Sequence, residues 1–332
     1  TGTATRTVTI SSITGDGTLG ISIAAATATD TAGNSAPSAG PSTTFTVDNT
    51  APTVSIGAPS ASSTRTGPIT YTITYGGAGS VTLATGNVTL NTTGSANGTI
   101  GVSGTGTATR TVTISSITGD GTLGISIAAA TATDTAGNSA SSAGPSTTFT
   151  VDNTAPTAST ISPTTASPTN GSSVIFSVHF SESVQNFNNA TDLVITKTGT
   201  VANTGATITG SAQDYTVTVT GVTGDGTMTL AVSNSSDVSD LVSNNLSSSV
   251  TSSAVTIDHT APTISIGAPS ASETRTGPIT FTVTYGGANS VTLATGNVTL
   301  NKTGTANGTI GVSGTGTATR TVTISSITGD GT

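Results

Sequence analysis

The chain has 332 residues, of which only 7 % are charged, with a formal net charge of −8, 41 glycines and no cysteine or tryptophan. This composition is unlike that of an ordinary cytosolic enzyme or of a charged disordered tail, and the lack of cysteine excludes disulfides, thiolate metal sites and cysteine nucleophiles. Five arginines and two lysines cannot form a basic stripe, so we expect neither nucleic acid nor an anionic membrane as a partner. No apolar run reaches about 18 residues, so we expect no membrane insertion in this segment.

Apolar residues alternate with polar ones along much of the chain, which is the period of a half-buried β-strand. In residues 69–75 the large apolar side chains occupy one phase and threonines occupy the other. Turn motifs such as ThrGlyAspGlyThr separate these segments at intervals of roughly ten residues, and no segment shows helical periodicity with caps. We therefore predict antiparallel sandwiches of about seven short strands. Further alternating sets, in chain order, are Val112 and Ile114; Leu123, Ile125 and Ile127; Phe149 and Val151; Val174, Phe176, Val178 and Phe180; Tyr215, Val217 and Val219; Met228, Leu230 and Val232.

The chain repeats itself over long distances. Residues 1–53 recur as 105–157 with one change, Pro37 for Ser141, and residues 53–122 recur as 263–332 with seven changes. The motif AspAsnThrAlaProThr, or AspHisThrAlaProThr, begins at positions 48, 152 and 258, so its copies are 104 and 106 residues apart (152 − 48 and 258 − 152). That spacing suits self-sufficient domains of about 100 residues rather than the roughly 20–50 residue units of solenoids.

The repeats divide the chain into units of two types, in the order A, A, B, A. Residues 1–18 and 315–332 are identical, so we expect the sequence to be a stretch of a longer tandem array that begins and ends inside a repeat. The expected units are the C-terminal half of an A-type unit at 1–50, a complete A-type unit at 51–154, a divergent B-type unit at 155–260, and the N-terminal part of an A-type unit at 261–332.

Substitutions between the A-type copies predict which face of each strand is buried. The changes Val54/Ile264, Tyr71/Phe281 and Ile73/Val283 exchange apolar residues of similar volume at the inner phase. The remaining changes alter charge or polarity, as solvated turns and outer faces permit. They are Ser63/Glu273, Gly79/Asn289, Thr92/Lys302 and Ser95/Thr305.

Three recurring motifs carry a resemblance. AspAsnThrAlaProThr between units, AspThrAlaGlyAsn before the last strand and ThrGlyAspGlyThr one strand earlier resemble the bacterial immunoglobulin-like domains of giant surface adhesins and related extracellular proteins. The B unit departs from this pattern, since it has SerAspLeuValSerAsnAsn at 239–245. The resemblance implies tandem immunoglobulin-like β-sandwiches that serve as cell-surface stalks or in adhesion, with calcium often stiffening the joints.

Most of the acidic residues fall in these loop motifs, and the expected topology brings them to the joints. If the last strand runs from the top of a unit to its bottom, the GlyAspGly turn and the linker share the bottom, next to the AspThrAlaGlyAsn turn of the following unit. The resulting oxygen ligands suit Ca²⁺. The expected groups are Asp16, Asp48, Asp134 and Asn138 at one joint, and Asp120, Asp152 and either Asp237 or Asp240 at the next. Asp, Asn and Gly also favour turns for local reasons, so turn formation alone remains an alternative explanation.

Catalytic motifs are scarce. His179 alternates to the outer face of its strand, and His259 stands where the other linkers have Asn49 and Asn153. Neither has a repeated acid–nucleophile partner. GlyAspGlyThr is not a phosphate loop, because no lysine follows and no helix begins there. We therefore expect no enzymatic activity.

The sequence as a whole predicts a non-enzymatic extracellular stalk or fibre of tandem immunoglobulin-like units at a bacterial cell surface. Its partners would be neighbouring repeats, with independent cores in series and prolines restricting the linkers. A self-assembling extracellular filament or sheath is an alternative, because so little charge protects the strand edges poorly against pairing with other copies. An ice- or glycan-binding face made of threonine rows is a third hypothesis.

Overall fold

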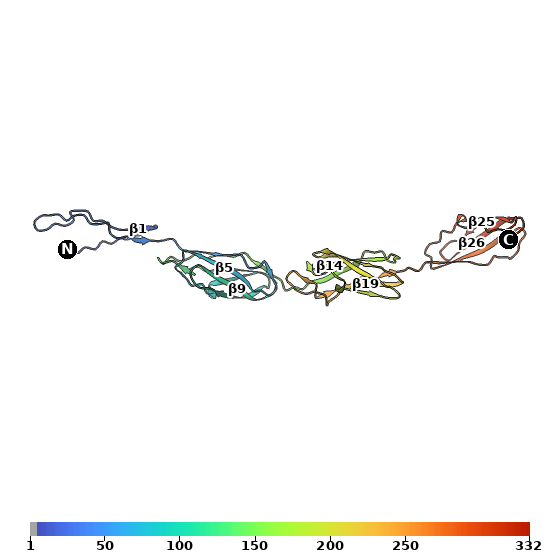
Figure 1. The fold of residues 1–332 in the computed structure, drawn as a ribbon, viewed down its shortest axis with the longest axis horizontal. Coiled ribbons are helices and arrows are strands. Elements are labelled where there is room, and N and C mark those ends of the chain that lie inside the picture. The colour runs from blue at the N-terminus through green and yellow to red at the C-terminus, as the bar shows by residue number, and fades with distance from the viewer. Residues whose placement is uncertain (1–4) are drawn as a thin grey trace.

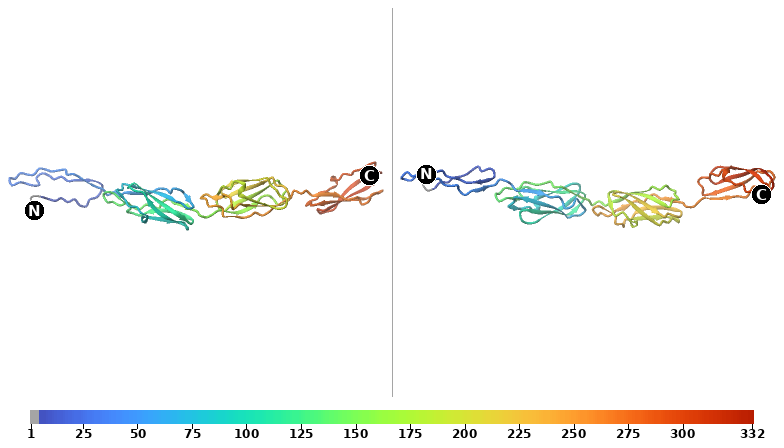
Figure 2. Two further views of the ribbon diagram at one scale, coloured as in Figure 1. Left: turned by 60° about the horizontal axis from the view of Figure 1, so that its bottom comes forward. Right: turned by 45° about the horizontal axis from the view of Figure 1, so that its top comes forward.

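The computed structural model describes residues 5–332, and it is an all-β structure drawn out into a row (Figure 1). The blue N-terminal segment and the red C-terminal segment lie at opposite ends, with the green and yellow segments between them, and two further views show the same order (Figure 2). The expectation of an all-β fold with antiparallel sheets is therefore confirmed. In this described range no helix is long and apolar enough to cross a membrane.

The N-terminal segment contains a two-stranded sheet and little packing. Its strands β1 (Gly17–Leu19) and β2 (Phe45–Val47) pair antiparallel, with Leu19 opposite Phe45. Both of those side chains are exposed. Residues 1–4 of the half-unit expected at 1–50 lie outside the described residues.

Two four-stranded sheets face each other in the segment that follows. One has the order β3-β5-β9-β8, and the other has the order β4-β12-β10-β7, in which β4 runs parallel to β12. A short pair, β6 with β11, flanks them. The bounds are β3 Thr53–Ile56, β4 Ser63–Thr64, β5 Ile69–Gly76, β6 Ser80–Val81, η1 Thr85–Asn87, β7 Val88–Thr92, β8 Asn97–Ser103, β9 Thr109–Thr118, β10 Gly121–Ile127, β11 Ala132–Thr133 and β12 Phe149–Val151.

The core of this segment consists of the alternating residues that the sequence places on one phase. Tyr71 and Ile73 of β5 are fully buried, while Thr72 and Thr74 between them are exposed. The outer threonines of β5 lie opposite threonines of β9, as in the pair Thr72↔Thr111. Tyr71 also packs near Phe149 of the other sheet, with ring centroids 6.5 Å apart, and its hydroxyl donates to the carbonyl oxygen of Thr147 at 2.9 Å.

The next segment repeats this layout with more aromatic residues in its core. One sheet has the order β17-β18-β14-β13-β21 and the other has the order β16-β19-β22. Phe180, Phe187 and Tyr215 pack edge to face, with centroids between 5.1 and 5.7 Å apart. The bounds are β13 Thr157–Pro163, β14 Ser173–Phe180, β15 Val184–Gln185, η2 Ala190–Asp192, β16 Leu193–Lys197, β17 Gly205–Ser211, β18 Asp214–Thr220, β19 Gly226–Val232, β20 Ser239–Asp240, β21 Ser248–Ser249 and β22 Val255–Ile257.

The C-terminal segment has one sheet, in the order β23-β24-β26-β25. Residues 298–302, whose counterparts form β7, are not a strand here, because the strand that pairs with β7 has no counterpart in this segment. Ile264 and Ile266 are 62 % and 70 % exposed. The bounds are β23 Thr263–Ile266, β24 Ile279–Gly286, η3 Thr295–Asn297, β25 Asn307–Ser313 and β26 Thr319–Thr328.

Candidate functional site

The candidate site is at the joints, which we define as residues 47–53 (first joint), 151–157 (second joint) and 257–263 (third joint). At each joint the aspartate of the GlyAspGly turn holds the linker. Asp120 accepts from the backbone N–H of Asn153 at 2.5 Å and from the hydroxyl of Thr154 at 3.3 Å. The same two contacts occur at the first joint from Asp16 to Asn49 and Thr50, and at the third from Asp225 to His259 and Thr260. The linker therefore leaves each unit along a fixed path.

The linker aspartate is also fixed by its own turn. Asp48, Asp152 and Asp258 each accept from the backbone N–H of the threonine two residues later, at 3.0 Å. Aspartate commonly forms such local turns. Turn chemistry therefore accounts for one oxygen of each linker aspartate.

Two hydrogen bonds of the same kind tie a linker to the unit that follows. The side-chain amide of Asn138 donates to the carbonyl oxygen of Asp48 at 2.9 Å, and the amide of Asn244 donates to the carbonyl oxygen of Asp152 at 2.9 Å. Each asparagine amide is shared with the aspartate four residues before it, at 2.8 Å from Asn138 to Asp134 and 2.7 Å from Asn244 to Asp240. The first and second joints are thus built on one plan.

The second joint has further hydrogen bonds, of which the one from Arg65 to Ser243 runs directly between the two flanking units. The guanidinium of Arg65 donates to the carbonyl oxygen of Ser243 at 3.3 Å, and the backbone N–H of Ser247 donates to the carbonyl oxygen of Pro156 at 3.0 Å. The amide of Asn153 donates to the carbonyl oxygen of Arg65 at 3.1 Å, which links the linker to the preceding unit. These contacts add to the hydrogen bonds that hold the second joint.

Three carboxylates meet at this second joint. Asp152, Glu182 and Asp240 each offer one oxygen, and these oxygens all lie within 4.8 Å of one another. Asp240 is only 2 % exposed, and Asp152 and Glu182 are half-buried. Convergent carboxylate oxygens are the ligands that Ca²⁺ prefers. Asp152 and Asp240 were predicted from the sequence, whereas Glu182 was not.

The pKa of Glu182 is raised above the ordinary glutamate value. Burial is the largest cause, and repulsion from the negative charges of Asp152, Asp240 and Asp120 adds to it. A raised pKa means that the ionised form is disfavoured in the folded protein. The pKa of Asp134 at the first joint is instead lowered, chiefly by the hydrogen bond from Asn138. The ionised carboxylate is therefore disfavoured at Glu182 of the second joint and favoured at Asp134 of the first joint.

The difference follows from one position. Val184 lies opposite Asp240 in the pair β15–β20. Extending the register of the pair β6–β11 by one residue puts Gly79 opposite Asp134, the counterpart of Asp240. Glu182, two residues before Val184, therefore corresponds to Gly77, two residues before Gly79. A glycine there leaves the first joint with Asp48 and Asp134 but no third acid. Within residues 5–332 the cluster at the second joint is the one place where three such ligand atoms converge.

The remaining predicted residues lie near the joints in other roles. Asp16 and Asp120 hold the linkers, as described above, and do not converge with the aspartates of the following unit. Asp237 is exposed, and its carbonyl oxygen accepts from the amide of Asn186 at 3.3 Å. Of the two alternatives offered by the B unit, the structure brings Asp240 to the linker.

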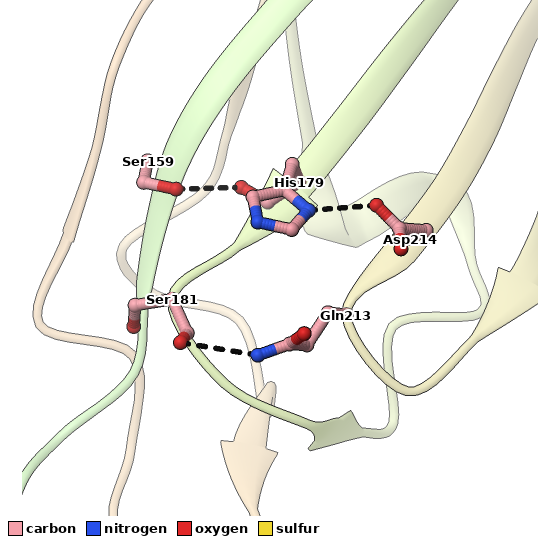
Figure 3. A network of polar contacts seen from close by, with 5 residues as sticks. All are labelled: Ser159, His179, Ser181, Gln213 and Asp214. Carbon is pink, nitrogen blue, oxygen red and sulfur yellow. Dashed lines mark hydrogen bonds and ion pairs between the residues drawn. The ribbon is translucent and has the colours of Figure 1, made fainter.

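The histidines have structural partners. His179 is on the outer face of β14, as predicted, with Nδ1 2.6 Å from an oxygen of Asp214 (Figure 3). The nearby hydroxyl of Ser159 donates to the carbonyl oxygen of His179, not to its ring, so this group lacks a nucleophile–base pair. The Nδ1 of His259 lies 2.9 Å from the carbonyl oxygen of Gly224, the position that the amide of Asn153 takes against Gly119.

Comparison with known proteins adds no assignment to this geometry. No protein-family model matches the chain, and no curated protein matches it.

Proposed function

We propose that the chain is a non-enzymatic extracellular structural or adhesive repeat protein, a stalk of tandem immunoglobulin-like units at a bacterial cell surface. Strand order supports the immunoglobulin-like part. In chain order β3, β5, β8 and β9 take the places of strands A, B, D and E, and β7, β10 and β12 take those of C, F and G. The orders β3-β5-β9-β8 and β12-β10-β7 then correspond to the ABED and CFG sheets of that fold.

The observation that carries the stalk proposal is the repeated hydrogen bond across the joints. Asn138 and Asn244 each donate to the linker aspartate that precedes their own unit, while Asp16 and Asp120 hold the same linkers from the other side. A linker fixed from both sides transmits orientation from one unit to the next. The row seen in Figure 1 is the shape expected of a spacer that holds another domain away from a surface.

Calcium is part of this proposal at the second joint only. Asp152, Glu182 and Asp240 provide three carboxylate oxygens that a divalent cation could share, and the cation would offset the repulsion that raises the pKa of Glu182. Ca²⁺ is favoured over Mg²⁺ because it tolerates irregular, flexible oxygen cages.

A filament is the second candidate function, and the low charge of the chain favours it, because few charges protect the strand edges against pairing with other copies. A third, a face that binds ice or glycans, would use the threonine pairs of β5 and β9, such as Thr72↔Thr111. Those pairs are also what the solvated phase of two neighbouring strands requires, so they add little weight.

Small-angle scattering and electron microscopy of the purified chain test the stalk proposal. We expect thin, unbranched rods in which the distance between neighbouring units varies little. The double substitution Asn138→Ala and Asn244→Ala should widen the distribution of angles between neighbouring units. Compact particles, or rods unaffected by the double substitution, would contradict it.

A further inference from the structure

Each of the two complete units contains an asparagine that is followed by glycine. They are Asn97–Gly98 in the A-type unit and Asn170–Gly171 in the B-type unit. Asparagine is thermolabile in proteins, because the backbone nitrogen of the next residue can attack its side-chain amide. Glycine hinders that attack least, since it has no Cβ. The two dipeptides have the same chemistry, so their surroundings decide how readily each one reacts.

At Asn97 the reacting groups are held together at an open edge of the sheet. The backbone N–H of Gly98 donates to Oδ1 of Asn97 at 2.8 Å, and the Asn97 side chain is exposed to water. Asn97 begins β8, the edge strand of the sheet β3-β5-β9-β8. The register of β8 with β9 shifts between the pairs Asn97↔Thr118 and Thr99↔Ser115, so Gly98 has no residue paired opposite it. The side-chain carbonyl therefore lies against the nitrogen that would attack it.

Packing keeps a glycine at position 98. A Cβ there would come within 2.6 Å of Cγ2 of Ile114 and 3.3 Å of the carbonyl oxygen of Ser115. Ile114 is a fully buried member of the core, so it has little freedom to move aside. The fold therefore requires an unhindered nitrogen directly after Asn97.

The hydrogen bonding at Asn170 is different. The backbone N–H of Gly171 donates to the hydroxyl of Thr169 at 3.0 Å. Thr169 is itself fixed, because its N–H donates to the carbonyl oxygen of Thr256 and its carbonyl oxygen accepts from the N–H of Asp258, both at 2.9 Å. Asn170 is exposed like Asn97, but the N–H that follows it is engaged by a different side chain.

We propose that Asn97 is a self-modification site, at which the side-chain amide is converted to a carboxylate without an enzyme. The nitrogen of Gly98 loses its proton to water or hydroxide and attacks Cγ of Asn97. The bond from nitrogen to Cγ forms, the bond from Cγ to Nδ2 breaks, and Nδ2 leaves as ammonia with the proton. Water then opens the succinimide ring at one of its two carbonyl carbons. Opening at Cγ gives aspartate, and opening at the backbone carbonyl gives isoaspartate.

The product changes the charge of an edge strand. β8 (Asn97–Ser103) has no charged residue, and the three acids of the unit at 51–154 are Asp120, Asp134 and Asp152 in its turns and linker. A charge on an edge strand opposes pairing with the strands of other chains. Deamidation would therefore make this edge less able to pair as the protein ages. The reaction itself depends on neither the proposed stalk function nor calcium.

Peptide mapping by mass spectrometry of the 332-residue chain, incubated in its folded state, tests the proposal. We expect aspartate and isoaspartate to accumulate at position 97 at least roughly 10-fold faster than at position 170, because only Asn97 is held against its nucleophile. The rate should rise with pH, since the nitrogen must lose a proton. In denaturant the two rates should converge. A folded chain in which Asn97 reacts no faster than Asn170 would overturn the proposal.

Two variants separate the hydrogen bonding from general exposure. Asn97→Gln should abolish the isoaspartate at position 97, because the longer side chain must form a larger ring, and should leave thermal unfolding and the rate at Asn170 unchanged. Thr169→Val removes the hydroxyl that engages Gly171 and keeps the branched shape, so the rate at Asn170 should rise several-fold. An unchanged rate at Asn170 in the Thr169→Val chain would show that these hydrogen bonds do not set the reactivity, and would overturn the assignment.

Discussion

The side-chain amide of Asn244 donates to the carbonyl oxygen of Asp152 at 2.9 Å, so a nearly fully buried side chain of one unit holds the linker that leads into it. Asn138 has the same relationship to Asp48. A joint held through the backbone of its linker needs no particular side chain on the linker residue itself. Joint stiffness is therefore expected to depend more on the asparagines than on the linker aspartates.

Asn244→Ala tests that dependence. The substitution removes the bond to Asp152 and leaves an oxygen of the buried Asp240 without its partner, so the local cost should be about 1–3 kcal/mol. Thermal unfolding and small-angle scattering would show a lower stability and a wider distribution of joint angles. Asn245→Ala, one residue along and exposed, is the matched control and should change neither measurement.

We also expect the complete unit at residues 51–154 to fold independently of its neighbours. The buried core that includes Tyr71 and Phe149 draws all its members from residues 69–151. Residues 51–154 expressed alone should therefore fold as a monomeric β domain, whereas residues 261–332 alone should not, because they hold a single sheet. Circular dichroism and chemical denaturation of the two fragments decide this. A disordered spectrum for 51–154 would show that neighbouring units share structure.

The sequence predicted the strands and their buried faces well, for a physical reason. Alternation such as Ile69 to Tyr75 has a single interpretation when one face must be buried, and the exchange of Tyr71 for Phe281 shows independently which face that is. The order of strands also led us to predict that the acids of the turns lie near the joints. The structure brings Asp240 close to Asp152, and cation binding at the joints stays a prediction.

Glu182 could not be found in this way. It follows the end of β14 between two serines, it has no counterpart in the A-type copies, and its neighbours Asp152 and Asp240 are 30 and 58 residues away (182 − 152 and 240 − 182). Only the joint between two different units brings the three together. The hydrogen-bonding roles of Asp16 and Asp120 were likewise beyond sequence reasoning, since a turn aspartate and a metal ligand look alike until their partners are known.

Phe149 and Phe45 offer a test of burial at two positions with the same local sequence. Phe149 is 1 % exposed in the complete unit, and Phe45 is 44 % exposed in the N-terminal segment. Phe149→Ala should lower the free energy of unfolding of its unit by about 3–5 kcal/mol, and the exposed Thr148→Ala by under about 1 kcal/mol. Phe45→Ala should leave the unfolding of the second unit unchanged. Denaturant titrations would measure all three.

Glu182 makes the second joint sensitive to both pH and calcium. Because its pKa in the folded protein is raised, the stability that it contributes is present below the ordinary glutamate pKa and is lost as the pH rises through the raised value. At neutral pH without calcium, Glu182→Gln should therefore stabilise the joint by removing one of three repelling charges. With calcium the order of stability should reverse, because the ion offsets the repulsion only when the carboxylate of Glu182 is there to bind it.

Calorimetry should detect calcium binding to the parent chain and a large loss of calcium affinity in the Glu182→Gln variant. The matched control is Asp237→Asn, which removes a nearby exposed charge outside the cluster and should leave both the binding and the pH dependence unchanged. If parent and Glu182→Gln chains respond alike to calcium, the three carboxylates do not form a cation site and the joint is held by its hydrogen bonds alone.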